Sequence, residues 1–188
     1  MSRKPSCDWP SDDPLILRYH DEEWGVPIHD DRKIFEFFVL DAFQAGLSWR
    51  TVLHKREHLR KAFDNFNVKK ISKYGEEEVT RLLSDEKIIR NKAKINATIS
   101  NAGCFLKVQK EFGSFDNYIW RFTGGKPIKN KLKALSEMPA SSKESDEMSR
   151  DLKSRGFKFV GTTICYSFMQ AAGLINDHLV RCFRYQTI

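Results

Sequence analysis

Apolar residues recur at helical spacing along most of this chain of 188 residues, and this periodicity limits its possible folds more than any other feature. Asp31 is expected to cap a helix that carries Ile34, Phe35, Phe38 and Phe43 on one face. No clean alternating run and no Asn-Gly turn indicates a β-hairpin. The sequence therefore predicts an all-α protein.

Further helical segments follow from the same spacing and from residues that start or end helices. We expect them after Ser48, at 79–83, from about Asn91 to Glu111, at 115–122, from 141 to 154 and from 162 to 173. Ser141 and Glu144 have the spacing of a capping box, which predicts where the 141–154 helix begins.

The domain organisation predicted from this pattern is a single all-α domain over residues 1–188. Its main helical lobe would span about 30–140 and would be followed by a helical hairpin at 141–173. The terminal segments 1–29 and 174–188 would lie beside each other. Glycines and a proline interrupt the helical pattern at 124–127, so the lysine-rich stretch to about Ala140 is expected to be a loop.

Cysteine and histidine residues at the two ends of the chain form two half-sites of metal-ligand type. Cys7 and His20 lie near the start, and His178 and Cys182 lie near the end with a spacing that places both on one face of a helix. Two thiolates and two imidazoles are a typical ligand set of a closed structural zinc site. Either a single Zn²⁺ ties the two ends together, or these residues are buried separately and share no ligand.

The segment RGFKFVGTT at 155–163 separates the last two predicted helices. Gly156 and Gly161 offer free backbone N–H groups, and the following helix presents its N-terminus, which attracts phosphate. Lys158 adds a positive charge, and Arg150, Lys153 and Arg155 come shortly before it. An ordinary helix–helix turn with two glycines would leave the same pattern.

The segment QAGLSW at 44–49 forms a second turn between helices. Gly46 permits an unusual backbone angle, so that Leu47 could stand at an exposed tip and wedge into a base stack. Trp49 could offer a stacking face. The alternative is a simple turn whose Leu47 and Trp49 pack inward.

A set of aromatic residues and one carboxylate completes the candidate residues: Trp9, Tyr19, Trp24, Trp49 and Asp41. Aromatic faces stack on bases and attract cations, although the same residues could simply form a core. Asp41 lies on an otherwise apolar helix face between Leu40 and Ala42, where a carboxylate needs a partner or a function.

Charge and composition restrict the partners and the compartment. The net charge is +7 with a pI near 9.2, which suits a polyanionic partner. The start MSRKPSCDWP has no apolar run, and no stretch reaches membrane-spanning length, so we expect no signal peptide and no membrane partner. Four cysteines without a secretory signal favour a reducing compartment, and we expect a cytoplasmic monomer.

Several stretches resemble the 3-methyladenine DNA glycosylase I family, bacterial alkylation-repair enzymes of the helix-hairpin-helix superfamily. They are CDW at 7–9, YHDEEWGVP at 19–27, QAGLSW at 44–49, IIRNKAKI at 88–95 and GFKFVGTTICYSFMQAAGLINDH at 156–178. The resemblance extends from about Cys7 to Cys182. It implies an enzyme that extrudes 3-methyladenine from alkylated double-stranded DNA and hydrolyses its glycosidic bond, releasing free 3-methyladenine without cleaving the strand.

The resemblance also assigns residues. Cys7, His20, His178 and Cys182 match the ligands of one structural Zn²⁺. Tyr19 and Trp49 match the residues that sandwich the extruded base, and Trp9 matches another pocket position; with Asp41 they are the expected base-binding residues. Tyr19, Asp41 and Trp49 are the expected catalytic residues. The expected DNA-binding residues are Gln44, Ala45, Gly46, Leu47, Gly156, Phe157, Lys158, Gly161 and Thr163.

One departure from the family pattern concerns Asp41, where the family usually has Glu that hydrogen-bonds the methylated base. Aspartate keeps the charge and is shorter by one methylene, so base preference or rate could differ. The alternative function is a damaged-DNA-binding homologue with impaired or altered activity. Relatives in the superfamily use an Asp shortly after the hairpin to stabilise the sugar cation. The corresponding segment here, 162–173, contains no acidic residue.

Overall fold

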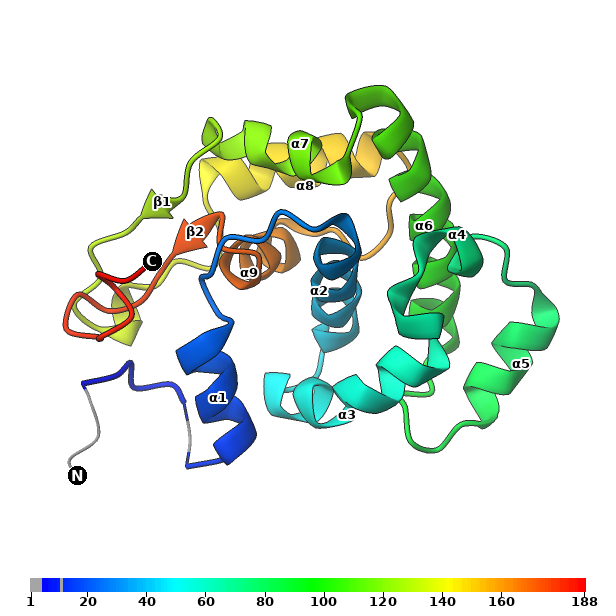
Figure 1. The fold of residues 1–188 in the computed structure, drawn as a ribbon, viewed down its shortest axis with the longest axis horizontal. Helices are drawn as coiled ribbons and strands as arrows, with labels where there is room; N and C mark the ends of the chain where they lie inside the picture. The colour runs from blue at the N-terminus through cyan, green and yellow to red at the C-terminus, as the bar shows by residue number, and fades with distance from the viewer. Residues whose placement is uncertain (1–4, 11) are drawn as a thin grey trace.

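The computed structural model describes residues 5–10 and 12–188. Its elements are α1 (Pro14–Glu22), α2 (Asp31–Gln44), α3 (Trp49–Ala62), η1 (Asp64–Phe66), α4 (Val68–Ile71), α5 (Glu76–Ser84), α6 (Lys92–Phe112), α7 (Phe115–Trp120), η2 (Arg121–Thr123), β1 (Ile128–Lys129), η3 (Leu135–Glu137), α8 (Lys143–Ser154), α9 (Thr162–Ala171) and β2 (Ile175–Asn176) (Figure 1). The predicted all-α class is confirmed, and each predicted helical segment is found. Within the described residues, no helix is long and apolar enough to cross a membrane.

Helix α2 runs through the centre of the molecule and packs against α3, α6, α7 and α9 (Figure 1). Every residue from Ile34 to Phe43 is buried, because neighbours cover the helix on all sides. Two carboxylates lie within this buried run. Glu36 accepts a hydrogen bond from Arg56 Nε at 2.5 Å, whereas Asp41 Oδ2 has no partner. The isolated Asp41 is therefore the exception in the core.

Aromatic contacts attach the α8–α9 hairpin to this central helix. The ring of Phe38 meets those of Phe157 and Phe168 edge-on, with centroids 5.5 Å and 5.4 Å away. Phe115 stacks on Phe105 at 3.9 Å and closes the other side of the cluster. Edge-on and stacked rings add a specific geometry to the burial of apolar area, so this cluster fixes the hairpin relative to α2.

The start of α2 differs by one residue from the prediction, with a structural consequence. Asp30, not Asp31, caps α2 by accepting a hydrogen bond from Lys33 N at 2.8 Å. Asp31 instead accepts from Phe115 N at 2.9 Å and Asp116 N at 2.8 Å. Its carboxylate thus satisfies backbone donors at the first turn of α7, a long-range contact that local spacing cannot reveal.

The capping box of α8 is also shifted by one position. The pair is Ser142 and Ser145, each side chain accepting from the other's backbone N–H, rather than Ser141 and Glu144. Serine can complete a capping box without a carboxylate because its hydroxyl also accepts a hydrogen bond. The boundary of the helix moves by one residue, and its face toward the core is unchanged.

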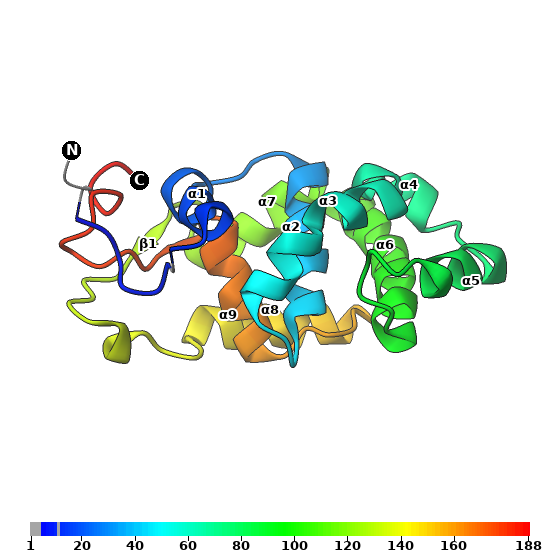
Figure 2. The same ribbon diagram turned by 90° about the horizontal axis from the view of Figure 1, so that it is seen from below.

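The two terminal segments lie at one end of the molecule, opposite α4 and α5, in both views (Figures 1 and 2). There β1 and β2 form a parallel two-residue pair that the sequence pattern does not indicate. Gly173 turns the chain between α9 and β2 at φ +75°, and a Cβ on it would lie 2.3 Å from the backbone of Val26 and Pro27. Only glycine fits this crossing.

Candidate active site

A cavity of about 170 Å³ opens between α1, α2, α3 and α9. Its lining residues are Trp9, Tyr19, Trp24, Asp41, Gln44, Trp49, Met138, Ser167 and Gln170. The structure thus brings together all four residues that the sequence assigned to a base pocket, from four separate stretches of chain. Met138, Ser167 and Gln170 are lining residues that the sequence analysis did not single out.

Aromatic rings form most of the cavity wall. Tyr19 and Trp49 lie with ring centroids 5.0 Å apart and planes tilted by 48°, and Trp9 meets Trp24 edge-on at 5.0 Å. The indole Nε1 atoms of Trp9 and Trp49 are buried and have no hydrogen-bond partner. Tyr19 and Trp49 thus contact each other, so in this structure they form a wall against which a planar ligand can stack, and they do not leave the gap for the sandwich that the family resemblance predicts.

Asp41 contributes the only carboxylate among the residues that line this cavity. The residue is 3% exposed, and its Oδ2 has no hydrogen-bond partner. Burial raises the pKa of this carboxyl well above its ordinary value of 3.8. Since an unpaired buried carboxylate is costly, the site gains free energy when a cation or a hydrogen-bond donor enters it.

A second cleft, of about 200 Å³, adjoins the cavity. Both share Asp41, Gln44 and Ser167, and the cleft is completed by Ala45, Gly46, Leu47, Thr163 and Ile164. The tip at 44–47 and the first turn of α9 thus form the two sides of an entrance. A base entering the cavity would pass between them.

The tip itself has the backbone conformation that the sequence predicts. Gly46 adopts φ +75°, and Ser48 caps α3 by accepting from Thr51 N. Leu47 is 40% exposed, which excludes the alternative that it packs inward, whereas Trp49 turns toward the cavity. An apolar side chain held outward beside a base-sized cavity is suited to fill the gap that an extruded base leaves.

Lys94 supports this tip, a role that the sequence analysis did not assign. Its ammonium group donates to the carbonyl oxygens of Phe43 at 2.7 Å and Ala45 at 2.5 Å. Both carbonyls belong to the end of α2, where helical acceptors lack intrahelical partners. The lysine lies within the IIRNKAKI stretch that carries the family resemblance, which was the available signal.

The turn between α8 and α9 is held by side chains from other elements. The amide of Asn101 on α6 accepts from Lys158 N at 2.8 Å and donates to its carbonyl oxygen at 3.0 Å. Gly156 adopts φ +90°, which favours glycine, and Phe159 adopts φ +55°, which nothing in the sequence indicated. Ser149 donates to the carbonyl oxygen of Val160. The turn is thus rigid.

The residues predicted to bind DNA here fall into two groups. Gly156, Lys158 and Thr163 are exposed and Gly161 is half-buried. The backbone N–H of Gly156, which was expected to be free, donates to the carbonyl oxygen of Lys153 at 3.0 Å, so Gly161 and the side chains of Lys158 and Thr163 remain for a phosphate. Phe157 is 3% exposed and packs in the core, so its side chain anchors the turn instead.

Not all of the positive charge expected near this turn is free. Arg155 is paired with Glu111 at 2.7 Å and with Asp151 at 2.6 Å, and its guanidinium also lies over the Phe112 ring. Its charge is therefore largely neutralised within the protein, so Arg155 is not a free cation for a phosphate. Lys158 remains the exposed cation on the turn.

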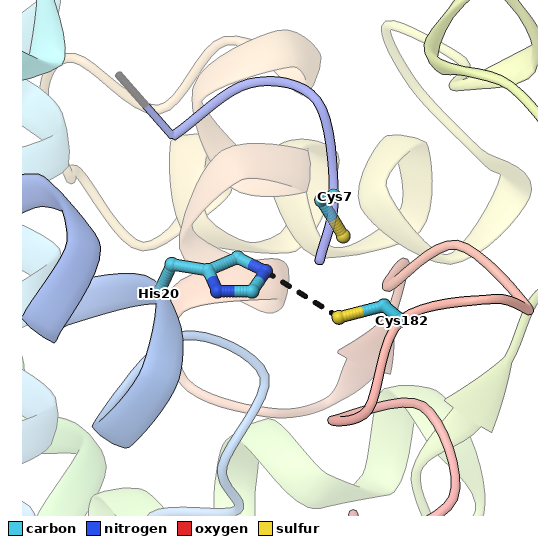
Figure 3. Close-up of side chains that lie close together, drawn as sticks. All are labelled: Cys7, His20 and Cys182. Atoms are coloured by element: carbon cyan, nitrogen blue, oxygen red, sulfur yellow. Dashed lines mark hydrogen bonds between the residues drawn. The ribbon is translucent and has the colours of Figure 1, made fainter. Parts of the chain in front are cut away.

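Three of the four predicted metal ligands converge at the terminal end of the molecule. Ligand atoms of Cys7, His20 and Cys182 all lie within 4.8 Å of one another, with His20 Nε2 facing Cys182 Sγ at 3.6 Å (Figure 3). Asp21 holds the other ring nitrogen of His20 at 2.6 Å. A carboxylate on the far nitrogen orients a histidine toward a metal, as zinc sites commonly require.

His178 lies next to this cluster but outside the group of three. Its ring centroid is 5.0 Å from that of His20, its Nδ1 is held by Asn176 at 3.0 Å, and its buried Nε2 has no partner. Burial lowers the pKa of His178 to about 3, so the imidazole is neutral, the form that binds metals. The segment from 178 to 182 is not helical, so the convergence does not arise from helical spacing.

The donor set and its burial fit a zinc ion. Burial raises the pKa of the Cys7 thiol to about 12, and a bound divalent cation would reverse this by stabilising the thiolate. The buried Nε2 of His178, which has no hydrogen-bond partner and lies beside this cluster, would be the fourth donor that a closed tetrahedral site needs.

The entrance, the rigid turn and the aromatic cavity lie together on one all-helical scaffold. This arrangement suits an enzyme that binds the DNA backbone at the turn and draws one base out of the duplex. The class of proteins built in this way is the helix-hairpin-helix DNA glycosylases.

Comparison with known proteins identifies the family within this class. The methyladenine glycosylase family matches residues 9–185. DNA-3-methyladenine glycosylase 1 of Escherichia coli strain K12 is 50% identical over 179 residues, covering 95% of this chain and 96% of that protein. The DNA-3-methyladenine glycosylase of Haemophilus influenzae is 42% identical over 176 residues, covering 94% and 95%.

Solved structures agree. A crystal structure of 3-methyladenine DNA glycosylase I superposes with a TM-score of 0.92 at 51% identity, covering 95% of this chain and 98% of that one. The Staphylococcus aureus enzyme gives the same TM-score at 34% identity, covering 95% of each chain. The chain belongs to the methyladenine glycosylase family, as a 3-methyladenine DNA glycosylase I. The family expected from the sequence is thus confirmed.

Proposed function

We propose that this chain binds alkylated double-stranded DNA, draws 3-methyladenine into the cavity lined by Tyr19 and Trp49, and hydrolyses its glycosidic bond. The observation that carries the proposal is the buried, unpaired carboxyl of Asp41 inside an aromatic cavity. A base that bears a positive charge and an exocyclic amine supplies what this site lacks. Aromatic faces attract the cation, and Asp41 accepts from the amine.

The chemistry asks little of the protein beyond this recognition. Methylation at N3 places a positive charge on the base, so the glycosidic bond is weak and the base leaves without being protonated. The enzyme extrudes the base, excludes bulk water around it and stabilises its charge before water attacks the sugar. Extrusion costs a few kcal/mol, less for a damaged base that pairs poorly.

Strand cleavage is not part of the proposed reaction. No lysine lines the cavity or the entrance cleft within the described residues, and Lys94 is held away from both by its two carbonyl partners. A Schiff-base nucleophile is therefore missing where the sugar would lie. The products are free 3-methyladenine and an intact strand with an abasic site.

DNA binding is assigned to the two sides of the entrance. The α8–α9 turn presents Lys158, Gly161 and the N-terminus of α9 to phosphates, and Leu47 fills the duplex where the base has left. Phosphate contacts carry no sequence information, so selectivity comes from the cavity. We place the enzyme on the DNA of a bacterial cytoplasm, acting as a monomer.

We further propose one Zn²⁺, held by Cys7, His20, His178 and Cys182. When bound, the ion supplies a cross-link between the two ends of the chain. Four protein ligands would leave no open position for water, so its role is structural. Cys7 also holds the C-terminal segment directly, by accepting a hydrogen bond from Leu179 N.

The deciding experiment is chromatographic analysis of bases released from methylated duplex DNA, with Asp41→Asn as the comparison. We expect the parent enzyme to release 3-methyladenine and the variant to release it about ten- to a hundredfold more slowly, the effect of losing one charged hydrogen bond. Gel analysis of the same DNA should show no strand breaks before alkaline treatment. Binding without base release would instead support the damaged-DNA-binding alternative.

A further inference from the structure

Gln170 lines the base cavity from α9 and is 8% exposed. Its Nε2 donates to Asp177 Oδ2 at 2.7 Å. Asp177 lies outside the cavity, on the segment that follows β2 and leads to His178. A residue of the base pocket is thus hydrogen-bonded to the C-terminal segment 174–188.

Asp177 is surrounded by donors. Its Oδ2 also accepts from the Tyr166 hydroxyl at 2.7 Å, and its Oδ1 accepts from Asn130 Nδ2 at 2.6 Å. An ionised carboxylate can only accept, so the amide of Gln170 must turn its NH₂ group toward it. The opposite orientation would place two acceptor oxygens against each other in a buried site.

The amide oxygen of Gln170 must then face away from Asp177. No hydrogen bond to this oxygen is present within the described part of the chain, and the side chain borders the cavity. It thus gives the cavity an acceptor on α9, a different helix from the one that carries Asp41. An acceptor that is fixed in orientation discriminates between ligands more strongly than one that can rotate.

Building on the proposed function, we infer that Asp177 orients Gln170 so that its amide oxygen reads the extruded base, and that Gln170 is a specificity-determining residue. The oxygen accepts a hydrogen bond from a base that carries an amino group, and it repels a base that carries a carbonyl at the same edge. Adenine derivatives are thereby favoured over guanine derivatives, independently of the positive charge that both acquire on methylation.

The test uses the two free bases 3-methyladenine and 3-methylguanine, which differ in that edge. Quenching of tryptophan fluorescence reports their binding, because three tryptophans line the cavity: Trp9, Trp24 and Trp49. Gln170→Met keeps the length and removes the acceptor. We expect it to lower the preference for 3-methyladenine over 3-methylguanine about tenfold, the effect of one hydrogen bond near 1.4 kcal/mol.

Asp177→Asn tests the orienting role. Asparagine can donate to the Gln170 oxygen, so the amide is free to turn its NH₂ toward the base, and the preference should shift in the same direction. In the double variant Gln170→Met/Asp177→Asn, the second change should add nothing. Metal content and melting temperature are recorded for each variant because Asp177 adjoins His178; if Asp177→Asn does not fold, Gln170→Met decides the inference alone.

If Gln170 had a purely structural role, replacing it would weaken the binding of both bases equally. An unchanged preference in Gln170→Met, with or without loss of affinity, would therefore overturn the inference. Failure of the proposed function is a separate result, namely that the parent enzyme releases no 3-methyladenine from methylated DNA.

Discussion

The ammonium group of Lys94 lies 2.5 Å from the carbonyl oxygen of Ala45 and 2.7 Å from that of Phe43. This cation from α6 satisfies carbonyl oxygens at the end of α2 that lack helical partners, and it complements the negative end of the helix dipole. The next residues are Gly46 and Leu47, which form the tip. A buried charge on one helix therefore fixes the start of the loop that meets the duplex.

Replacing Lys94 by methionine should impair the tip at 44–47 and leave the base pocket intact. The two carbonyls lose their partner, which costs about 1–3 kcal/mol of stability for each buried group left unsatisfied. We expect base release from duplex DNA to fall about tenfold while free 3-methyladenine binds as before, measured by single-turnover kinetics and fluorescence titration. Lys92→Met, at an exposed position of the same helix, is the control and should match the parent. Equal loss of free-base binding would contradict this role.

The raised pKa of Asp41 predicts how the reaction depends on pH. Burial disfavours the charged form, so the carboxyl of the free enzyme holds its proton to a pH well above 3.8. A cationic base binds the ionised form. The value of kcat/KM should therefore rise with pH through the pKa of Asp41 and then level off. Asp41→Asn should abolish this rise, and a rise that persists in the variant would assign it to another group.

The raised pKa of Asp41 also predicts that the stability of the fold falls as pH increases, whereas activity rises. The folded state holds the Asp41 proton more tightly than the unfolded state, so stability declines as pH increases from about 3.8 through the folded-state pKa. Asparagine does not titrate, so it never places a charge in this buried position. Asp41→Asn should therefore melt at a higher temperature than the parent at neutral pH, and the difference should shrink toward pH 4. Calorimetry across this range checks the sign, and a lower melting temperature at neutral pH would contradict it.

The sequence predicts the helices well because each has its own apolar stripe and its own capping residue. Ser48 caps α3 and Asn91 caps α6. It fails where the partner of a residue lies far along the chain. Asp31 looks like a local cap, yet it serves the start of α7, 84 positions later. The β1–β2 pair joins Ile128 to Ile175, 47 positions later, and two-residue strands leave no alternating pattern.

The candidate site divides in the same way. Family resemblance brings out Tyr19, Asp41 and Trp49, and the structure places them on one cavity. Lys94 and Gln170 act through contacts to a distant backbone and to a buried carboxylate, and their residue types alone carry no signal. Spacing also suggested a helix through His178 and Cys182, whereas an irregular loop brings Cys182 toward His20.

The zinc proposal predicts a loss of stability when one ligand is removed. Cys182→Ser should lower metal content below one ion per chain and lower the melting temperature, because the two ends of the chain are no longer tied. Cys104→Ser is the matched control, since this half-buried thiol lies away from the cluster. Metal analysis and calorimetry give the readout. One full equivalent of zinc in Cys182→Ser would exclude this ligand set.

The last prediction concerns the electrostatic part of DNA binding. Each phosphate contact by a lysine releases counterions, so affinity should fall steeply between 50 and 200 mM salt, by a slope that counts the contacts. Lys158→Glu places a negative charge on the exposed turn and should reduce both the affinity for any duplex and the salt slope, by about one contact. Lys69→Glu makes the same change of charge on α4, at the end of the molecule away from the termini, and should leave the slope unchanged. Fluorescence anisotropy with unmodified duplexes of two sequences measures both quantities. If the two variants behave alike, the net charge of the protein attracts DNA and the α8–α9 turn is not a specific phosphate site; if only Lys158→Glu lowers the slope, the turn holds the backbone while the cavity selects the base.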